Sequence, residues 1–131
     1  MRIYQVDSFS ARPFGGNPAG VCPLAEPAPE AWMQRVAAEV NVSETAFTHP
    51  LPDGSFRLRW FTPTAEVDLC GHATLATAHI IATAAEYPGR KQRPVKGELL
   101  RFATNSGELT AAVDEKGITL DFPATPVQGC P

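Results

Sequence analysis

One acidic residue in the chain has neighbours that suit a general base. Glu44 lies in a run of β-type residues, with Ser43 and Thr45 on either side and Phe47 close behind. A strand of this kind can direct a carboxylate into an apolar cleft, where burial raises its pKa toward a value useful for taking up protons. From spacing alone, a glutamate on a solvated strand face is the commoner outcome. Glu44 is therefore a candidate base that needs support from the rest of the chain.

A second candidate is the start of an apolar stretch that begins at Gly71. Glycine at a helix N-terminus leaves backbone N–H groups open to close approach by an anion, which makes a cradle for a carboxylate or a phosphate. His72 would then act as a donor or proton relay, because the positive end of the helix dipole disfavours its protonation. The alternative is that Gly71 allows a tight entry into the core and that His72 caps the helix. The pattern by itself does not choose between the two.

The three cysteines are Cys22, Cys70 and Cys130, and none of them forms a C-x-x-C pair. An odd number with this spacing argues against a disulfide framework or a thiolate zinc site and favours reduced thiols in the cytosol. Cys70 stands just before the apolar stretch, and a helix N-terminus there would lower the pKa of its thiol. A free cysteine is more often simply a core residue.

The remaining patterns predict no metal and no nucleotide cofactor. The histidines His49, His72 and His79 lack metal-ligand spacing, and no H-E-x-x-H motif is present. The segment Gly15-Gly16-Asn17-Pro18 is too short for a dinucleotide or phosphate loop and lacks the strand-to-helix context.

Composition and charge limit the class of protein to which these residues belong. The chain has 131 residues, 44% of them hydrophobic and 19% charged, which predicts one globular domain with its own core. The formal net charge of −3 gives no electrostatic footprint for nucleic acid or an anionic membrane. Asp7 stands where a secretory signal would be apolar, and no apolar run is long enough to span a bilayer. We therefore expect a cytoplasmic protein with a small-molecule or protein partner.

The elements that must position the candidates are strands around one helix. Gly71 to Ala85 carries no charge and has small apolar residues on every side, so we expect a buried helix threaded through the domain. An amphipathic helix is expected around Trp32 to Val40, with Asn41 as its C-terminal cap. Strands are expected at residues 3–9, 21–24, 42–49, 56–61, 99–104, 108–113 and 118–122, with a breaker-rich loop at 12–20.

The last three expected strands form a meander, and the whole arrangement predicts the α+β class. Its turns, Asn105-Ser106-Gly107 and residues 114–117, each end in a glycine suited to a positive φ. The tail from residue 123 has three prolines and a glycine, which is typical of a linker. We therefore place one domain over residues 1–125 and the start of an interdomain linker at residues 126–131.

Five motifs in series resemble the phenazine-biosynthesis PhzF-like isomerases in both order and spacing. They cover the chain from about residue 2 to residue 125, and they are Val6-Asp7-Ser8-Phe9, Gly16-Asn17-Pro18-Ala19-Gly20-Val21, Asn41-Val42-Ser43-Glu44-Thr45-Ala46-Phe47, Phe61-Thr62-Pro63 and Leu69-Cys70-Gly71-His72-Ala73-Thr74. The resemblance favours Glu44 as a functional residue over the solvated alternative.

The resemblance implies a fold similar to diaminopimelate epimerase. That fold has two pseudo-symmetric halves, each a barrel-like, antiparallel or mixed sheet wrapped on a central buried helix, with the active site between them. Family members are roughly twice as long, so this chain corresponds to the N-terminal half. We expect the other half of the site to come either from a C-terminal half outside this chain or from a second copy of the chain in a homodimer.

The resemblance also implies roles for particular residues. Glu44 corresponds to the carboxylate that moves a proton on a dihydro-hydroxyanthranilate in the namesake enzymes, in a reaction that uses no cofactor. Ser43, Gly71 and His72 correspond to positions that line the substrate pocket, and Asn17 corresponds to a loop residue at its border. The expected activity is isomerisation or epimerisation of a small carboxylate, and the resemblance implies phenazine-type secondary metabolism as its setting.

Two alternatives accompany this reading. Related epimerases and proline racemases use two cysteines, each before a glycine at a helix start, and Cys70-Gly71-His72 resembles that pattern too. Cys70 is thus a rival acid or base, although the S-E-T setting of Glu44 is typical of the PhzF-like branch. The other alternative is a non-catalytic module that binds a small carboxylate or dimerises without turnover.

Overall fold

The computed structural model describes residues 3–8, 17–68, 71–83, 99–114 and 117–121. Two helices lie in these ranges, α1 (Glu30–Val40) and α2 (Gly71–Thr83). The strands are β1 (Tyr4–Ser8), β2 (Asn17–Pro23), β3 (Glu44–Pro50), β4 (Phe56–Phe61), β5 (Glu66–Val67), β6 (Leu99–Thr104), β7 (Gly107–Asp114) and β8 (Gly117–Asp121).

All the strands belong to one mixed sheet of eight strands, in the order β1-β2-β3-β4-β6-β7-β8 with β5 paired to β4. β2 runs parallel to β3, and β4 runs parallel to β6. The other neighbours in this order are antiparallel, including the expected meander of β6, β7 and β8. The mixed sheet with few helices agrees with the expected α+β class.

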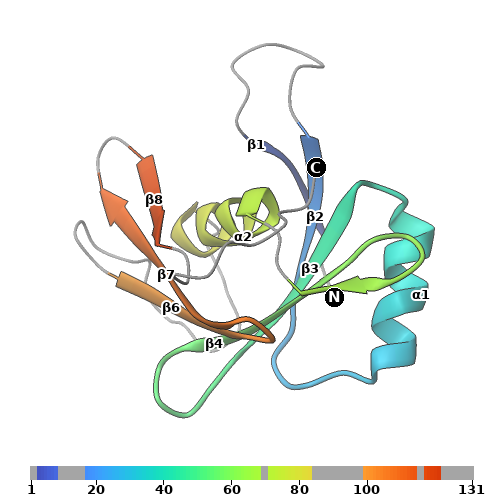
Figure 1. Ribbon diagram of the computed structural model, residues 1–131, viewed down its shortest axis with the longest axis horizontal. Helices are drawn as coiled ribbons and strands as arrows, with labels where there is room; N and C mark the ends of the chain where they lie inside the picture. The colour runs from blue at the N-terminus through green and yellow to red at the C-terminus, as the bar shows by residue number, and fades with distance from the viewer. Residues whose placement is uncertain (1–2, 9–16, 69–70, 84–98, 115–116, 122–131) are drawn as a thin grey trace.

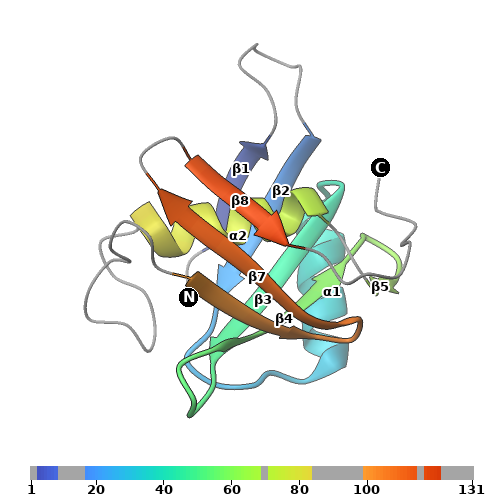
Figure 2. The same ribbon diagram turned by 60° about the vertical axis from the view of Figure 1, so that its left-hand side comes forward.

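Within the described ranges the sheet is open rather than closed into a barrel. β1 and β8 stand at the two ends of the strand order. Helix α2 contacts β1, β2 and β3 at one end and β7 and β8 at the other, so it lies against strands from both ends of the sheet (Figures 1 and 2). The barrel-like closure implied by the resemblance is therefore not confirmed, because β1 and β8 are not paired with each other in the described part of the chain.

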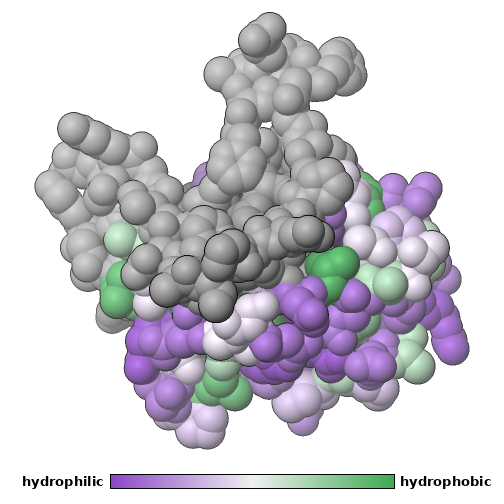
Figure 3. Space-filling model, in the orientation of Figure 1, coloured by the Kyte–Doolittle hydropathy of each residue, from purple (hydrophilic) through white to green (hydrophobic). Residues whose placement is uncertain are grey.

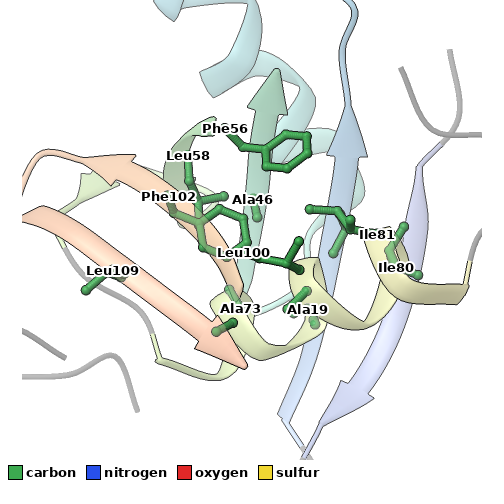
Figure 4. Packing of buried hydrophobic residues seen from close by; sticks show 14 of the residues in the cluster. Ala19, Ala46, Phe56, Leu58, Ala73, Ile80, Ile81, Leu100, Phe102 and Leu109 are labelled. Atoms are coloured by element: carbon green, nitrogen blue, oxygen red, sulfur yellow. The ribbon is translucent and has the colours of Figure 1, made fainter. Parts of the chain in front are cut away.

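The larger core lies between α2 and the face of the sheet that α2 covers. Figure 4 shows Phe56, Leu58, Phe102 and Ile81 in this cluster, all of them buried. Burial of this apolar area is the main favourable contribution to folding. The helix expected at residues 71–85 is thus present as far as Thr83, and the residues of it whose burial is described are buried except for His79.

Helix α1 covers the opposite face of the sheet. Met33 and Ala37 of the helix pack with Cys22, Phe47 and Phe61 in a second buried cluster. This amphipathic pattern explains why the segment forms a helix, since every third or fourth residue faces the sheet.

The end of α1 is set by two residues. Asn41 caps the helix in the left-handed conformation (φ 54°), and its N–H donates to the Ala37 carbonyl, as the sequence predicted. A Cβ at Gly20 would lie 3.2 Å from Thr45 Oγ1 and 3.5 Å from Val40 Cγ1, so glycine permits close packing of the helix end on the sheet.

The first loop is shorter than expected, because β2 already begins at Asn17. Pro18 lies within β2 opposite Asp7 of β1, whereas pairing with β3 starts only at Ala19. A proline lacks the N–H of a ladder, and at this position it has a partner strand on one side only. Residues 12–16 of the expected loop and the expected tail from residue 123 lie outside the described residues.

Candidate active site

Glu44 is the first residue of β3 and is almost wholly buried, with 2% of its surface exposed. Side chains alternate between the faces of a strand, so Glu44 shares a face with Ala46. Ala46 belongs to the core cluster that α2 covers, whereas Phe47 belongs to the cluster under α1. The carboxylate therefore points to the α2 face of the sheet, not to a solvated one.

Burial raises the pKa of Glu44 above its ordinary value of 4.5. Removal of water destabilises the charged carboxylate more than the neutral acid, and this is the cause of the shift. A carboxylate with a raised pKa is a stronger base than an exposed glutamate. The solvated alternative considered from spacing alone is thus wrong, and the electrostatics suit proton transfer.

Two other predicted residues lie at the same end of the sheet as Glu44. Ala19 of β2 is the register partner of Glu44, and Asn17 stands two residues before Ala19 on the same strand. Ser43 immediately precedes β3 and is exposed. The parallel pairing of β2 with β3 therefore brings the backbones of Asn17, Ser43 and Glu44 to one end of two neighbouring strands. The side chain of Asn17 lies outside the described part.

Helix α2 begins at Gly71, with His72 as its second residue. Ala73, the next residue, belongs to the same buried cluster as Ala19, the register partner of Glu44 (Figure 4). The first N–H groups of a helix have no partner within it, so this end can donate to an anion. The structure thus joins the start of α2 and the β2–β3 pair in one core, although the side chain of His72 is not described.

The rival residue Cys70 lies outside the described residues, as do Cys130 and the turn at residues 115–116. Cys22, the remaining cysteine, is buried under α1 on the other face of the sheet. Burial raises the pKa of its thiol to about 11. Cys22 therefore suits a structural role rather than a reactive one.

A polar network that the sequence did not predict anchors the segment leading to α2. Arg59 of β4 binds both carboxylate oxygens of Glu66, and Asn105 donates to Glu66 Oε2 at 3.3 Å. Ser106 Oγ donates to the Asp68 carbonyl at 2.7 Å. Asp68 is three residues before the helix start, so the network fixes the path of the chain just before the candidate anion cradle. The sequence alone did not predict this network, because its hydrogen-bonded partners are 7, 38 and 39 positions apart.

Within the described ranges, no group of three or more His, Cys, Asp or Glu side chains is placed to hold a metal ion. No helix in the same ranges has both the length and the apolar character needed to cross a membrane.

On the face shown in Figure 3, hydrophilic residues predominate over the described part and hydrophobic ones form small separate patches. Ile3 and Leu99, at 38% and 55% exposure, are the exposed large hydrophobic residues among those described. Scattered apolar residues of this kind are normal for a protein surface.

Most of the chain matches one family of known proteins. Residues 6–127 match the family model described as phenazine biosynthesis-like protein (PhzC-PhzF). An uncharacterized isomerase of Halalkalibacterium halodurans is 51% identical over 126 residues, which are 93% of this chain and 43% of that protein. An uncharacterized isomerase of Pseudomonas aeruginosa is 48% identical over 130 residues, 99% of this chain and 47% of that protein. The chain thus spans less than half the length of these curated relatives.

Solved structures agree with this match. A PhzF-family phenazine biosynthesis protein from Enterococcus faecalis has a TM-score of 0.79 and 46% identity, covering 94% of this chain and 44% of its own. A hydroxyproline epimerase from Agrobacterium vitis has a TM-score of 0.55 at 10% identity, covering 80% of this chain and 38% of its own, which shows a similar fold alone. The family match and these identities show that the chain belongs to the phenazine biosynthesis-like (PhzC-PhzF) family.

Proposed function

We propose that this chain supplies one wall of the catalytic cleft of a cofactor-independent isomerase, with Glu44 as its general base. The observation that carries the proposal is the nearly complete burial of Glu44 on the α2 face of the sheet, together with its raised pKa. The names of the relatives, isomerase in two of them, support the reaction class.

The proposed reaction moves one proton within the substrate. A Glu44 carboxylate oxygen accepts the proton of an acidic C–H bond, and the electron pair of that bond passes into an adjacent conjugated system. The resulting carboxylic acid then returns the proton to another carbon on the same face of the substrate. The pKa of the base must lie near the working pH for both steps to be fast, and desolvation of Glu44 moves its pKa in that direction.

The proposed substrate carries a carboxylate that binds at the start of α2. Backbone N–H groups at Gly71 and His72 would donate to it, and the helix dipole adds a favourable interaction with negative charge. Ser43 and Asn17, at the same end of the β2–β3 pair as Glu44, would line the cleft. A dihydro-hydroxyanthranilate is the first probe, because the resemblance points to phenazine-type chemistry.

The opposite wall would come from a second body, and we propose a second copy of this chain or a C-terminal half like that of the longer relatives. Sedimentation equilibrium distinguishes these two sources. A stable dimer supports completion by a second copy. A monomer contradicts that version and requires a separate C-terminal half for activity.

Deuterium exchange tests the assignment of Glu44. The chain is incubated in D₂O with the dihydro-hydroxyanthranilate, and mass spectrometry follows deuterium entering the substrate. Glu44→Gln is expected to slow exchange by about 10²-fold or more, as loss of a positioned base does. Glu39→Gln is the matched control, because Glu39 is exposed on α1 at the other face of the sheet.

Two other outcomes would replace this proposal. Exchange that survives Glu44→Gln but stops in Cys70→Ser would assign the chemistry to Cys70, as in a two-cysteine racemase. Binding of the probe by a confirmed dimer with no exchange at all would favour a non-catalytic module for small carboxylates.

A further inference from the structure

A pocket of about 150 Å³ lies on the face of the sheet opposite to Glu44. Its apolar wall includes Leu24, Met33 and Phe47. Phe47 and His49, which both line it, point to the opposite face of β3 from Glu44, since they follow Glu44 by three and five positions. The pocket is therefore separate from the candidate active site.

The apolar wall is held rigidly by aromatic contacts. The Phe47 ring makes edge contacts with Trp32 at 6.1 Å and with Phe61 at 5.5 Å between ring centroids. Such pairs are favourable beyond simple burial, so the ring has little freedom to collapse into the pocket. An apolar cavity of about 150 Å³ is large enough to hold a benzene ring.

The other wall of the pocket is cationic. Arg57 and Arg59 of β4 both line it, together with His49, which is the register partner of Arg57. Arg59 is neutralised by its ion pairs with Glu66 and Glu30. Arg57 differs, since the hydrogen bonds that it donates within the described part of the chain have neutral acceptors.

The acceptors of Arg57 are the Ala103 carbonyl at 3.0 Å and Asn105 Oδ1 at 2.7 Å. Burial and the neighbouring charge of Arg59 lower the pKa of Arg57, while the charge of Glu66 acts in the opposite direction. A guanidinium has five N–H donors and stays protonated in proteins, so Arg57 keeps donors for an anion. A carboxylate matches that planar group best.

We propose that this pocket binds a small aromatic carboxylate of the benzoate class. The ring lies on the wall formed by Met33 and Phe47, and the carboxylate binds Arg57 with His49 as a further partner. The combination of an apolar wall sized for one ring and a partly desolvated cation at its edge selects this chemistry over a purely apolar or a purely ionic ligand. Occupancy here does not depend on the function proposed for Glu44.

Titration of the chain with benzoate tests the proposal, with binding followed by amide NMR shifts. Saturable shifts confined to the neighbourhood of Leu24, Met33, Phe47 and His49 are expected, with saturation below about 10 mM. Benzamide lacks the charge and acetate lacks the ring, so each is expected to bind at least about tenfold more weakly. Absence of saturable shifts, or shifts centred on β3 near Glu44 and the start of α2, would overturn the proposal.

Arg57→Gln is expected to weaken benzoate binding at least about tenfold. Arg35→Gln is the matched control, because it removes the same charge from an exposed position on α1 that does not line the pocket. Unchanged affinity in Arg57→Gln, or an equal loss in Arg35→Gln, would contradict the assigned cation. Should Arg57→Gln fail to fold, His49→Gln leaves the Arg57 hydrogen bonds in place and must still reduce the affinity.

Discussion

Arg59 holds Glu66 by both carboxylate oxygens, with Nε at 2.7 Å from Oε2 and Nη2 at 2.8 Å from Oε1. This two-bond geometry joins β4 to β5, the strand that leads to the start of α2. Both side chains are about one-fifth exposed, so solvent screens the pair only in part. The contact links sheet packing to the position of the candidate anion cradle.

Arg59→Met is therefore expected to lower the free energy of unfolding by about 1–3 kcal/mol, because the partly buried Glu66 loses its charged partner. Urea unfolding measures the change. Glu30 also bonds to Arg59, but its side chain is 69% exposed, so Glu30→Gln should cost at most about 1 kcal/mol. Equal losses of unfolding free energy in Arg59→Met and Glu30→Gln would show that the contact with Glu66 adds no measurable stability.

The raised pKa of Glu44 makes its contribution to stability depend on pH. Folding favours the protonated form, so this contribution is complete below the unfolded pKa, near 4.5, and is lost as pH rises through the higher folded pKa. Glu44→Gln removes the dependence. Relative to the natural chain, the variant should gain stability in urea unfolding as pH rises above about 4.5. A difference between the two proteins that does not change with rising pH would contradict the burial of a titrating carboxylate.

Thr48 also has a buried polar group, since its side chain is fully buried and Oγ1 has no hydrogen-bond partner among the residues that the structure describes. Valine has nearly the same shape and no hydroxyl to desolvate. Thr48→Val should raise the free energy of unfolding by about 1 kcal/mol, and thermal unfolding followed by circular dichroism can measure it. A loss of stability would mean that the hydroxyl has a partner, such as a bound water.

The Cys22 thiol should resist alkylation in the folded chain. Its pKa of about 11 leaves only about one part in a thousand as thiolate at pH 8, and its side chain is fully buried. Peptide mapping after iodoacetamide treatment should show modification of Cys22 only once urea unfolds the chain. Rapid modification under native conditions would contradict the packing of this residue beneath α1.

Local signals accounted for much of the fold. The cap at Asn41, the apolar helix from Gly71 and the strand limits of β4 and β6 follow from periodicity and breakers within a few residues. Local signals did not predict β5, the early start of β2 or the open sheet, because each of these depends on which strands pair across the chain. Pro18 reads as a breaker locally and is tolerated only because β3 pairs from Ala19 onward.

The candidate site was predictable only in part for the same reason. Glu44 could be named from its motif, but its burial follows from α2 packing on the sheet. The bonds from Arg59 to Glu66 and from Ser106 to Asp68 join residues 7 and 38 positions apart, and no local pattern marks them.

Deuterium exchange into the dihydro-hydroxyanthranilate, comparing the natural chain with Glu44→Gln and Glu39→Gln, tests the central claim most directly. The measurement should use the assembly that sedimentation identifies as complete. The account predicts exchange in the natural chain and in Glu39→Gln, and a loss of about 10²-fold or more in Glu44→Gln. Equal exchange rates in Glu44→Gln and Glu39→Gln would contradict Glu44 as the base.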